Sequence, residues 1–211
     1  MKQFRFKTIE SYIPDKPHLQ ILDIGAGSHS PSLTKRWKPD CIYTAVDIDL
    51  HYNNNEHDLR VVDKYIQTDL THLEFDAIAD NHYDIIFMSH VIEHLHNGDE
   101  VLKRLLPKLN AKGVIYIEFP SARSISFPSM RETLNFFDDP THCRIFSLKE
   151  ICNILMGQDY KILKAGIRSD KLNILLIPLK VIYNLLTRGY IRAGTFWDLF
   201  GFAEYVTGTK K

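Results

Sequence analysis

The stretch ILDIGAGSHS, residues 21–30, decides the fold. Its apolar start favours a short strand, and the strand stops at Gly25 and Gly27, which adopt turn conformations without a steric penalty from Cβ. Ser28 or Ser30 can cap a helix that follows. The pattern therefore predicts a strand, a glycine turn and a helix N-terminus, the arrangement in which open α/β sheets bind cofactors at the carboxyl end of a strand.

The details of this turn show whether it matches the pattern of a dinucleotide-binding turn. A dinucleotide-binding turn has the pattern G-x-G-x-x-G, but Ser30 occupies the position of the third glycine. The sequence instead reads Asp23-x-Gly25-x-Gly27, with a carboxylate near the end of the strand. A nicotinamide-dependent oxidoreductase is therefore disfavoured, while an ordinary turn of another α/β protein stays open from this motif alone.

Two further aspartates follow predicted strands. Residues 41–49 form a second buried strand that contains Asp47 near its end, about 20 residues beyond the glycines. A carboxylate at that distance can accept hydrogen bonds from the ribose hydroxyls of an adenosine cofactor. A third strand over residues 61–68 ends before Asp69, although aspartate in that position is also a common turn former.

A fourth strand over residues 83–88 leads into SHVIEHLH, residues 89–96. If this segment is helical, His90 and His94 lie on one face with Glu93 beside them. The spacing matches the H-x-x-E-H pattern of the inverted zinc peptidases, in which both histidines bind zinc and the glutamate acts as base. The segment is short and is broken by an Asn-Gly pair, so a zinc metallopeptidase remains as an alternative.

The alternation of strands and helices predicts the architecture. A fifth strand over residues 114–119, a sixth over 160–165 and a last one over 201–209 complete the series. We therefore predict an α/β, Rossmann-like, doubly wound and mostly parallel sheet. With 211 residues and 45% hydrophobic content, the chain is expected to form one domain over residues 1–211.

In this order and at these spacings, the motifs resemble those of the class I S-adenosylmethionine-dependent methyltransferases, small-molecule branch, and YDIIFMSHVIEHL resembles their fourth strand and its turn. The resemblance covers residues 18–165 well. It implies seven strands with an antiparallel last strand, a helical insertion at about 170–200 and S-adenosylmethionine as cofactor. The residues that it implies at the cofactor are Asp23 near the cationic end, Gly25 and Gly27 at the close approach, Asp47 at the ribose, Asp69 at the adenine and Ser89 at the mouth.

Residues 120–146 predict an aromatic acceptor-site loop. Its segment FFDDPTHCRIFS resembles one in bacterial methyltransferases, many of them encoded among cell-surface glycan functions. The resemblance makes His142 the first candidate for a catalytic base or acceptor-positioning residue, with His90 as the second. The alternative is that His142 only ties the loop down through Asp138 or Asp139.

Composition excludes some partners and sites. Lysine plus arginine and aspartate plus glutamate both number 26, so the formal net charge is zero, and no nucleic-acid partner is expected. Cys41, Cys143 and Cys152 form no C-x-x-C pair, which indicates neither a disulfide framework nor a cysteine zinc site. The N-terminal residues lack the apolar run of a signal peptide, so the sequence predicts a cytoplasmic protein.

The most apolar segment, residues 172–186, contains Pro178 and Lys180 and is shorter than the roughly 20 residues of a membrane-spanning helix. It predicts a buried or interface helix, without stable membrane insertion. A run of four aromatic residues could form a homodimer contact: Phe196, Trp197, Phe200 and Phe202.

Together these patterns predict an S-adenosylmethionine-dependent methyltransferase that acts on a small-molecule or glycan acceptor, with O-methylation as the expected reaction and no bound metal. Two other functions stay open. One is the zinc metallopeptidase with His90, Glu93 and His94, and the other is a non-catalytic, cofactor-binding partner subunit on the same fold.

Overall fold

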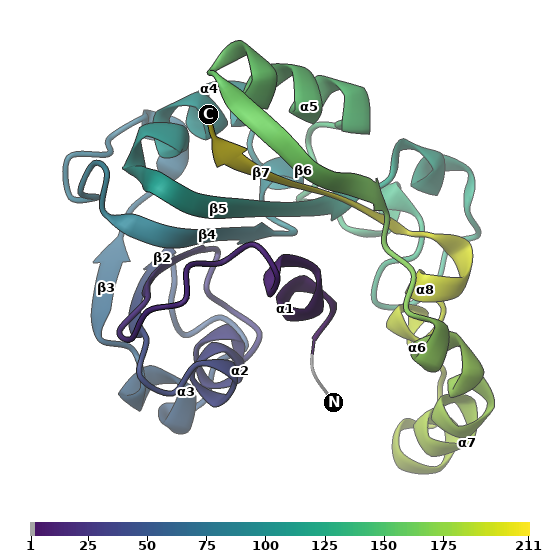
Figure 1. Ribbon diagram of the computed structural model, residues 1–211. Coiled ribbons are helices and arrows are strands. Elements are labelled where there is room, and N and C mark those ends of the chain that lie inside the picture. Colours follow the sequence, from purple (N-terminus) through teal and green to yellow (C-terminus); the bar gives the residue numbers. More distant parts are fainter. Residues whose placement is uncertain (1–2) are drawn as a thin grey trace.

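The computed structural model describes residues 3–211, which form one seven-stranded sheet flanked by helices (Figure 1). The strand order is β3-β2-β1-β4-β5-β7-β6, and only the pairs that include β7 are antiparallel. The prediction of a mostly parallel Rossmann-like sheet with an antiparallel last strand is confirmed. The strands are β1 (Gln20–Ile24), β2 (Ile42–Asp47), β3 (Lys64–Gln67), β4 (Tyr83–Ser89), β5 (Leu109–Pro120), β6 (Tyr160–Ile167) and β7 (Ala203–Lys210).

Helices cover both faces of the sheet, as Figure 1 shows. One face carries α1 (Phe4–Ile9), α2 (Ser30–Trp37) and α3 (Glu56–Arg60), and the other carries α4 (Gly98–Leu105) and α5 (Leu148–Gly157). Short 3₁₀ helices lie in the connections: η1 (Leu70–His72), η2 (Ile92–His94), η3 (Leu106–Lys108), η4 (Ala122–Ser126), η5 (Phe136–Asp138) and η6 (Ala193–Thr195).

Alternating strand residues build two separate hydrophobic cores. In β4, Ile85 and Phe87 pack with α1, whereas Ile86 and Met88 pack with α4 and α5. This alternation follows from the period of two in a strand, and both faces of β4 are buried because helices cover the sheet on both sides. The central strands therefore hold the loops at their ends in fixed positions.

The strand order indicates the edge of the sheet at which a ligand is expected to bind. The chain winds outward from β1 through β2 to β3 and then returns to β4 on the other side of β1, so the order reverses between β1 and β4. Ligands of open α/β sheets bind at such a reversal, outside the carboxyl ends of the strands. Because β5 and β6 are both antiparallel to β7, they run in the same direction, and the loop after β5 and the segment after β6 begin at this same edge.

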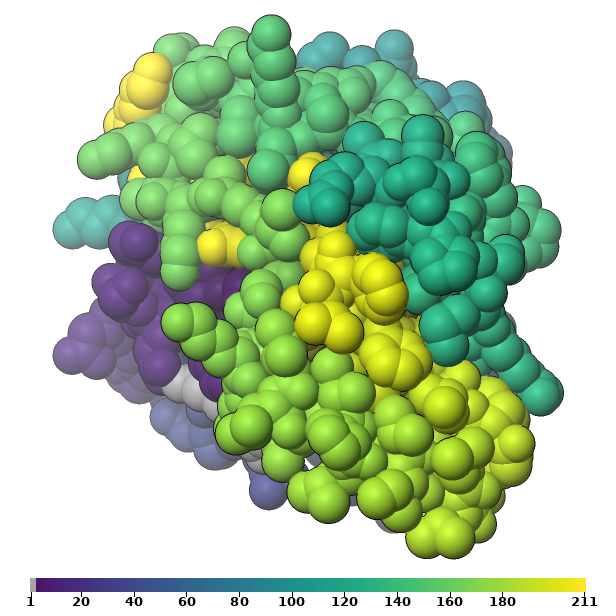
Figure 2. All heavy atoms as spheres, turned by 90° about the vertical axis from the view of Figure 1, so that its right-hand side faces the viewer, coloured from purple at the N-terminus to yellow at the C-terminus, as the bar shows by residue number. Residues whose placement is uncertain are grey.

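The segment between β6 and β7 contains α6 (Lys171–Leu175), α7 (Ile177–Arg188) and α8 (Trp197–Phe200). The predicted buried helix is wrong as far as burial goes: Asn184 is the buried residue of α7, while Leu186 is 82% exposed. Figure 2 shows this light-green segment at the surface beside the yellow α8 region. Within residues 3–211, no helix is both long and apolar enough to cross a membrane.

Two residues of the aromatic run near α8 make contacts within the chain. Phe202 is buried, and its ring stacks on Trp197 with centroids 4.6 Å apart. The indole Nε1 of Trp197 donates to the carbonyl of Thr133 at 2.7 Å. These two aromatic residues therefore attach the segment after β6 to the loop after β5, and a dimer contact through this run stays a prediction.

Candidate active site

The glycine turn after β1 touches the turn after β4. Gly25 has φ +71°, and a Cβ built on it would lie 2.2 Å from Cγ2 of Val91. A Cβ on Gly27 would lie 2.9 Å from the backbone oxygen of Tyr52. Both positions need glycine, Gly25 for its left-handed backbone and Gly27 for the close approach of another main chain. The glycines thus allow this turn to pack closely against neighbouring chain segments at the point where the strand order reverses.

Gly25→Ala is expected to lower the free energy of unfolding by about 1–2 kcal/mol, because alanine is strained at positive φ and its Cβ would collide with Val91. Urea denaturation at pH 7 measures the loss. Gly157→Ala is the matched control, since a Cβ at that position at the end of α5 meets no atom within 4 Å. Equal stability of the two variants would show that the turn tolerates a side chain.

Asp47 ends β2 at the same edge. Its Oδ1 accepts a hydrogen bond from the backbone N–H of Asp49 at 3.0 Å. Burial, and to a smaller extent the negative charges of Asp49 and Asp23, raise the pKa of Asp47 above its ordinary value. A carboxylate in these surroundings gains from hydrogen-bond donors, and ribose hydroxyls are donors of the right kind.

Asp23 has protein partners that the sequence did not reveal. Its Oδ2 accepts hydrogen bonds from the hydroxyls of Ser30 and of Tyr43, the latter at 2.7 Å, and lies 3.4 Å from Nη1 of Arg5 in α1. The carboxylate is 1% exposed. Arg5 thus compensates the charge of Asp23, and a contact of this carboxylate with the cationic end of a cofactor stays a prediction.

Asp69 follows β3 and caps η1. Its Oδ1 accepts hydrogen bonds from the hydroxyl and the backbone N–H of Thr71, at 2.6 and 2.9 Å. These two bonds hold the pKa of Asp69 below its ordinary value. The side chain therefore performs the turn-forming role that the sequence left open, and a contact with adenine stays a prediction.

Ser89 and His90 lie at the end of β4. The Ser89 hydroxyl is buried and has no hydrogen-bond partner among residues 3–211. His90 has φ +55°, and its ring nitrogens contact two carboxylates, Nδ1 to Glu93 at 3.2 Å and Nε2 to Glu118 at 3.1 Å. Although burial opposes it, the hydrogen bonds that His90 donates to Glu118 and Glu93 raise the pKa of His90 to about 9.

This geometry argues against His90 as the catalytic base. A base needs a free nitrogen within reach of the acceptor, whereas both nitrogens of His90 donate to buried carboxylates. Arg168, from the segment after β6, also binds Glu118 at 2.8 Å. His90 is therefore one cation in a buried network with Glu93, Glu118 and Arg168.

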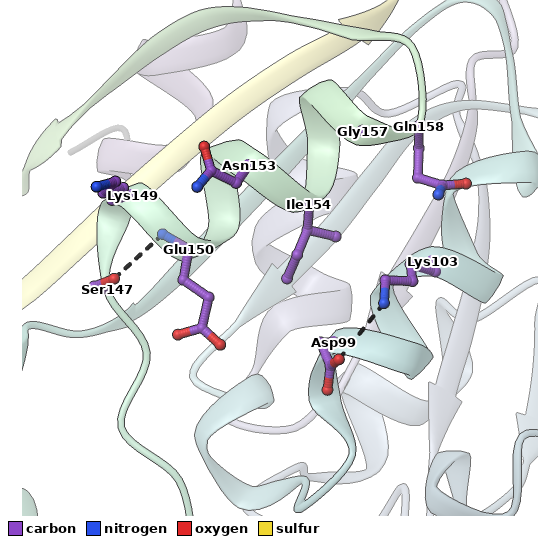
Figure 3. Close-up of a pocket in the computed structure, with 9 residues that line it drawn as sticks. All are labelled: Asp99, Lys103, Ser147, Lys149, Glu150, Asn153, Ile154, Gly157 and Gln158. Carbon is purple, nitrogen blue, oxygen red and sulfur yellow. Dashed lines mark hydrogen bonds and ion pairs between the residues drawn. The ribbon is translucent and has the colours of Figure 1, made fainter.

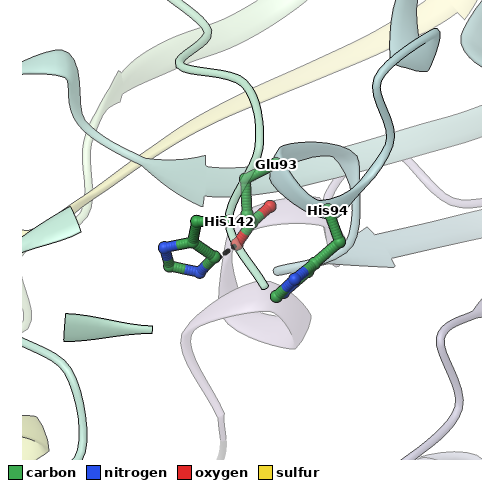
Figure 4. A group of neighbouring side chains, drawn as sticks. All are labelled: Glu93, His94 and His142. Carbon is green, nitrogen blue, oxygen red and sulfur yellow. Dashed lines mark ion pairs between the residues drawn. The ribbon is translucent and has the colours of Figure 1, made fainter. Parts of the chain in front are cut away.

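The zinc-peptidase interpretation fails on the same residues. The helix that would place His90 beside His94 is absent, since η2 spans only Ile92–His94 and His90 precedes it in a left-handed conformation. Glu93 and His94 instead lie close to His142, which belongs to the loop over residues 120–146. Figure 4 shows the rings of His142 and His94 on either side of Glu93 in that view.

The loop over residues 120–146 is fixed by its own carboxylates. The Oδ2 of Asp138 accepts hydrogen bonds from the backbone N–H groups of Met130, Leu134 and Asn135, at 3.0, 2.9 and 2.8 Å. These bonds and one from Ser129 outweigh the opposing effect of burial and lower the pKa of Asp138 to about 2. Asp138 thus holds together the part of the loop between Met130 and Asp138.

His142 keeps one nitrogen free of strong partners. Its Nδ1 lies 2.7 Å from the carbonyl oxygen of Phe136, to which it must donate. Its Nε2 lies 4.0 Å from Glu93 and 3.9 Å from Asp139, beyond hydrogen-bond distance. The bracing alternative for His142 therefore rests on Phe136 and not on Asp138 or Asp139.

A hollow of about 550 Å³ lies away from this edge (Figure 3). Residues of α4 and α5 line it, among them Lys103, Asn153 and Ile154. None of the sequence-predicted site residues belongs to its lining. The hollow is a furrow between two surface helices and not part of the site.

Sequence reasoning missed Arg5, Glu118 and Arg168. Arg5 contacts Asp23 from 18 residues away, and Arg168 contacts Glu118 from 50 residues away. No local motif relates such pairs. A buried glutamate within the apolar run of β5 was the one available signal, because a charge in a central strand needs a partner.

Comparisons with known proteins agree with this geometry. The family model described as "Methyltransferase domain" matches residues 3–165. Ubiquinone biosynthesis O-methyltransferases of two Rickettsia bellii strains are 29% identical over 115 residues, which is 52% of this chain and 45% of theirs. The match thus spans less than half the length of those relatives.

Solved structures share the fold. A SAM dependent methyltransferase from Archaeoglobus fulgidus is 19% identical with a TM-score of 0.61, over 98% of this chain and 91% of that one. An N-methyltransferase from Haemonchus contortus, solved with S-adenosylhomocysteine, is 14% identical with a TM-score of 0.67, over 98% of this chain and 52% of that one.

Proposed function

The chain belongs to the methyltransferase-domain family, and from that premise we propose that it transfers a methyl group from S-adenosylmethionine to an oxygen atom of a small-molecule or glycan acceptor. The observation that carries the proposal is the contact of the Gly25 turn with Val91 at the reversal of strand order, with Asp47 at the adjacent strand end. The Rickettsia relatives support oxygen as the acceptor atom, because their names specify O-methylation.

The residues of this edge fit the cofactor. Gly25 and Gly27 let the turn after β1 approach Val91 and Tyr52 closely, and Asp47 would accept hydrogen bonds from the ribose hydroxyls. The buried and unpartnered hydroxyl of Ser89 lies at the end of the neighbouring strand β4. When bound, the sulfonium cofactor supplies an activated methyl group, so the protein has to align the acceptor, exclude water and remove its proton.

We propose that His142 is the base that removes the acceptor's proton. Its Nδ1 is held by Phe136, so the neutral ring presents its Nε2 lone pair beside Glu93. Its side chain is 5% exposed, which keeps competing water away from that nitrogen. The loop around it is anchored to the segment after β6, for example by Trp197 on Thr133, and this anchoring fixes the acceptor side of the site.

Asp47→Ala is expected to weaken the binding of S-adenosylhomocysteine by about 10- to 100-fold, since hydrogen bonds to a charged group contribute about 1.5–3 kcal/mol. Calorimetric titration at pH 7 measures the change. Asp49→Ala is the matched control: it removes an exposed carboxylate two residues away whose bond goes to the backbone of His51. Folded wild-type protein that does not bind the ligand would rule out the proposed function.

A further inference from the structure

Glu93, His94 and His142 form a compact cluster on the acceptor side. One oxygen or nitrogen atom from each lies within 4.8 Å of the others. Around a tetrahedral zinc ion with bonds of about 2.1 Å, neighbouring ligand atoms are about 3.4 Å apart, so small side-chain rotations suffice to close the cluster. We propose that Glu93, His94 and His142 bind a divalent transition-metal ion.

Hydrogen bonds outside the cluster fix both histidines in the form that binds metals. The Thr141 hydroxyl donates to Asp139 at 2.5 Å, so it must accept the N–H of His94 Nδ1 at 2.9 Å. His142 donates its Nδ1–H to a carbonyl oxygen. Both neutral rings therefore present Nε2 lone pairs, and an Nδ1–H bound to a carbonyl or hydroxyl is the usual support of a metal-binding histidine.

Glu93 supplies the independent second observation. The residue is 1% exposed, and its Oε2 has no hydrogen-bond partner among the described residues, while its Oε1 contacts His90. An unpartnered buried carboxylate oxygen is costly, and a cation would satisfy it. The hydrogen bond from His90 holds Oε1 in place, 4.0 Å from Nε2 of His142, as a ligand carboxylate requires.

The main chain holds the two halves of the cluster together before any ion binds. Both Cys143 and Arg144 donate their backbone N–H groups to the carbonyl oxygen of Glu93, at 2.9 and 3.2 Å. The loop that carries His142 is thereby attached to η2, which carries Glu93 and His94. Sites with ligands on such tethered elements need little reorganisation to bind a metal.

The ligand set indicates the metal class and its task. Two imidazoles and one carboxylate suit Zn²⁺, Fe²⁺, Co²⁺ and Mn²⁺ and leave coordination positions open. Resting on the proposed function, this site would bind an oxygen of the acceptor and lower its pKa. In that arrangement His142 would hold the ion through Nε2 instead of acting as a base, and the acidified acceptor hydroxyl would release its proton to solvent water.

Cobalt titration of chelator-treated protein tests the site. Wild-type protein is expected to bind one Co²⁺ saturably, with the visible absorption of a cobalt ion in protein ligands. His94→Ala and His142→Ala should each weaken binding at least about 100-fold, because each removes a direct ligand. His96→Ala, which removes an exposed histidine of the same segment, should leave it unchanged.

Thr141→Val separates a metal site from a structural brace. It removes the acceptor for His94 Nδ1 and should weaken cobalt binding about 10- to 100-fold while the fold persists. Absence of one-to-one binding in wild-type protein, or equal affinity in wild type, His94→Ala and Thr141→Val, would overturn the proposal. Titration of the same samples with S-adenosylhomocysteine keeps the two proposals apart, since cofactor binding without cobalt binding rejects the metal site alone.

Discussion

Glu118→Ala is expected to lower the free energy of unfolding by about 3–5 kcal/mol, because two partly buried cations lose their common buried partner. Glu118 lies in β5 and accepts hydrogen bonds from Arg168 at 2.8 Å and from His90 at 3.1 Å. Tyr116 also donates to it. Although burial opposes it, the charge of Arg168 and the bond from His90 hold the pKa of Glu118 below its ordinary value, so the carboxylate is ionised at neutral pH.

Urea denaturation at pH 7 measures this loss, and an exposed pair provides the control. Glu132 forms an ion pair with Arg192 whose side chains are 30% and 49% exposed, so Glu132→Ala should change stability by no more than about 1 kcal/mol. Glu118→Gln keeps one acceptor oxygen and should fall between the two. Similar losses in Glu118→Ala and Glu132→Ala would mean that the buried network contributes no more than a surface pair.

The alternation of strands and helices and the mostly parallel sheet could be predicted because they follow from local patterns. Each central strand is a short apolar run that ends in a turn signal, and alternating helices make the sheet parallel. The ends of elements were less predictable. The Ser30 hydroxyl donates to Asp23, so His29 precedes α2 as the N-cap residue, in a left-handed conformation and without a side-chain bond. A tertiary contact thus replaced the local cap that the sequence predicted.

Some residues of the candidate site could also be predicted from local patterns, and others could not. Gly25 and Gly27 were predictable because the turn itself requires glycine, and the position of Asp47 was predictable because a recognisable apolar strand precedes it. The partnership of His90 with His94 was wrong because it assumed a continuous helix, whereas the chain turns at His90 with φ +55°. His142 lies 48 residues beyond His94 in the sequence. Only the path of the loop after β5 brings the two side chains together, and no local pattern predicts that path.

Asp23→Ala is expected to cost about 3–5 kcal/mol of stability, because it leaves the buried guanidinium of Arg5 without a carboxylate. Arg5 is 8% exposed, so water cannot replace the lost partner fully. The hydroxyls of Ser30 and Tyr43 lose their acceptor as well, and the contact between α1 and the strand β1 depends on these bonds. Urea denaturation at pH 7 and calorimetry with S-adenosylhomocysteine together measure the effect.

Asp47→Ala is the matched control, since it removes the same side chain from the next strand end, where no cation pairs with it within the described residues. We expect opposite profiles: Asp23→Ala loses stability first, and its cofactor affinity falls only as the folded fraction falls, whereas Asp47→Ala loses affinity and keeps its stability. If Asp23→Ala instead stays as stable as wild type and loses cofactor binding alone, the carboxylate faces the ligand as the sequence predicted, and Arg5 is not its essential partner.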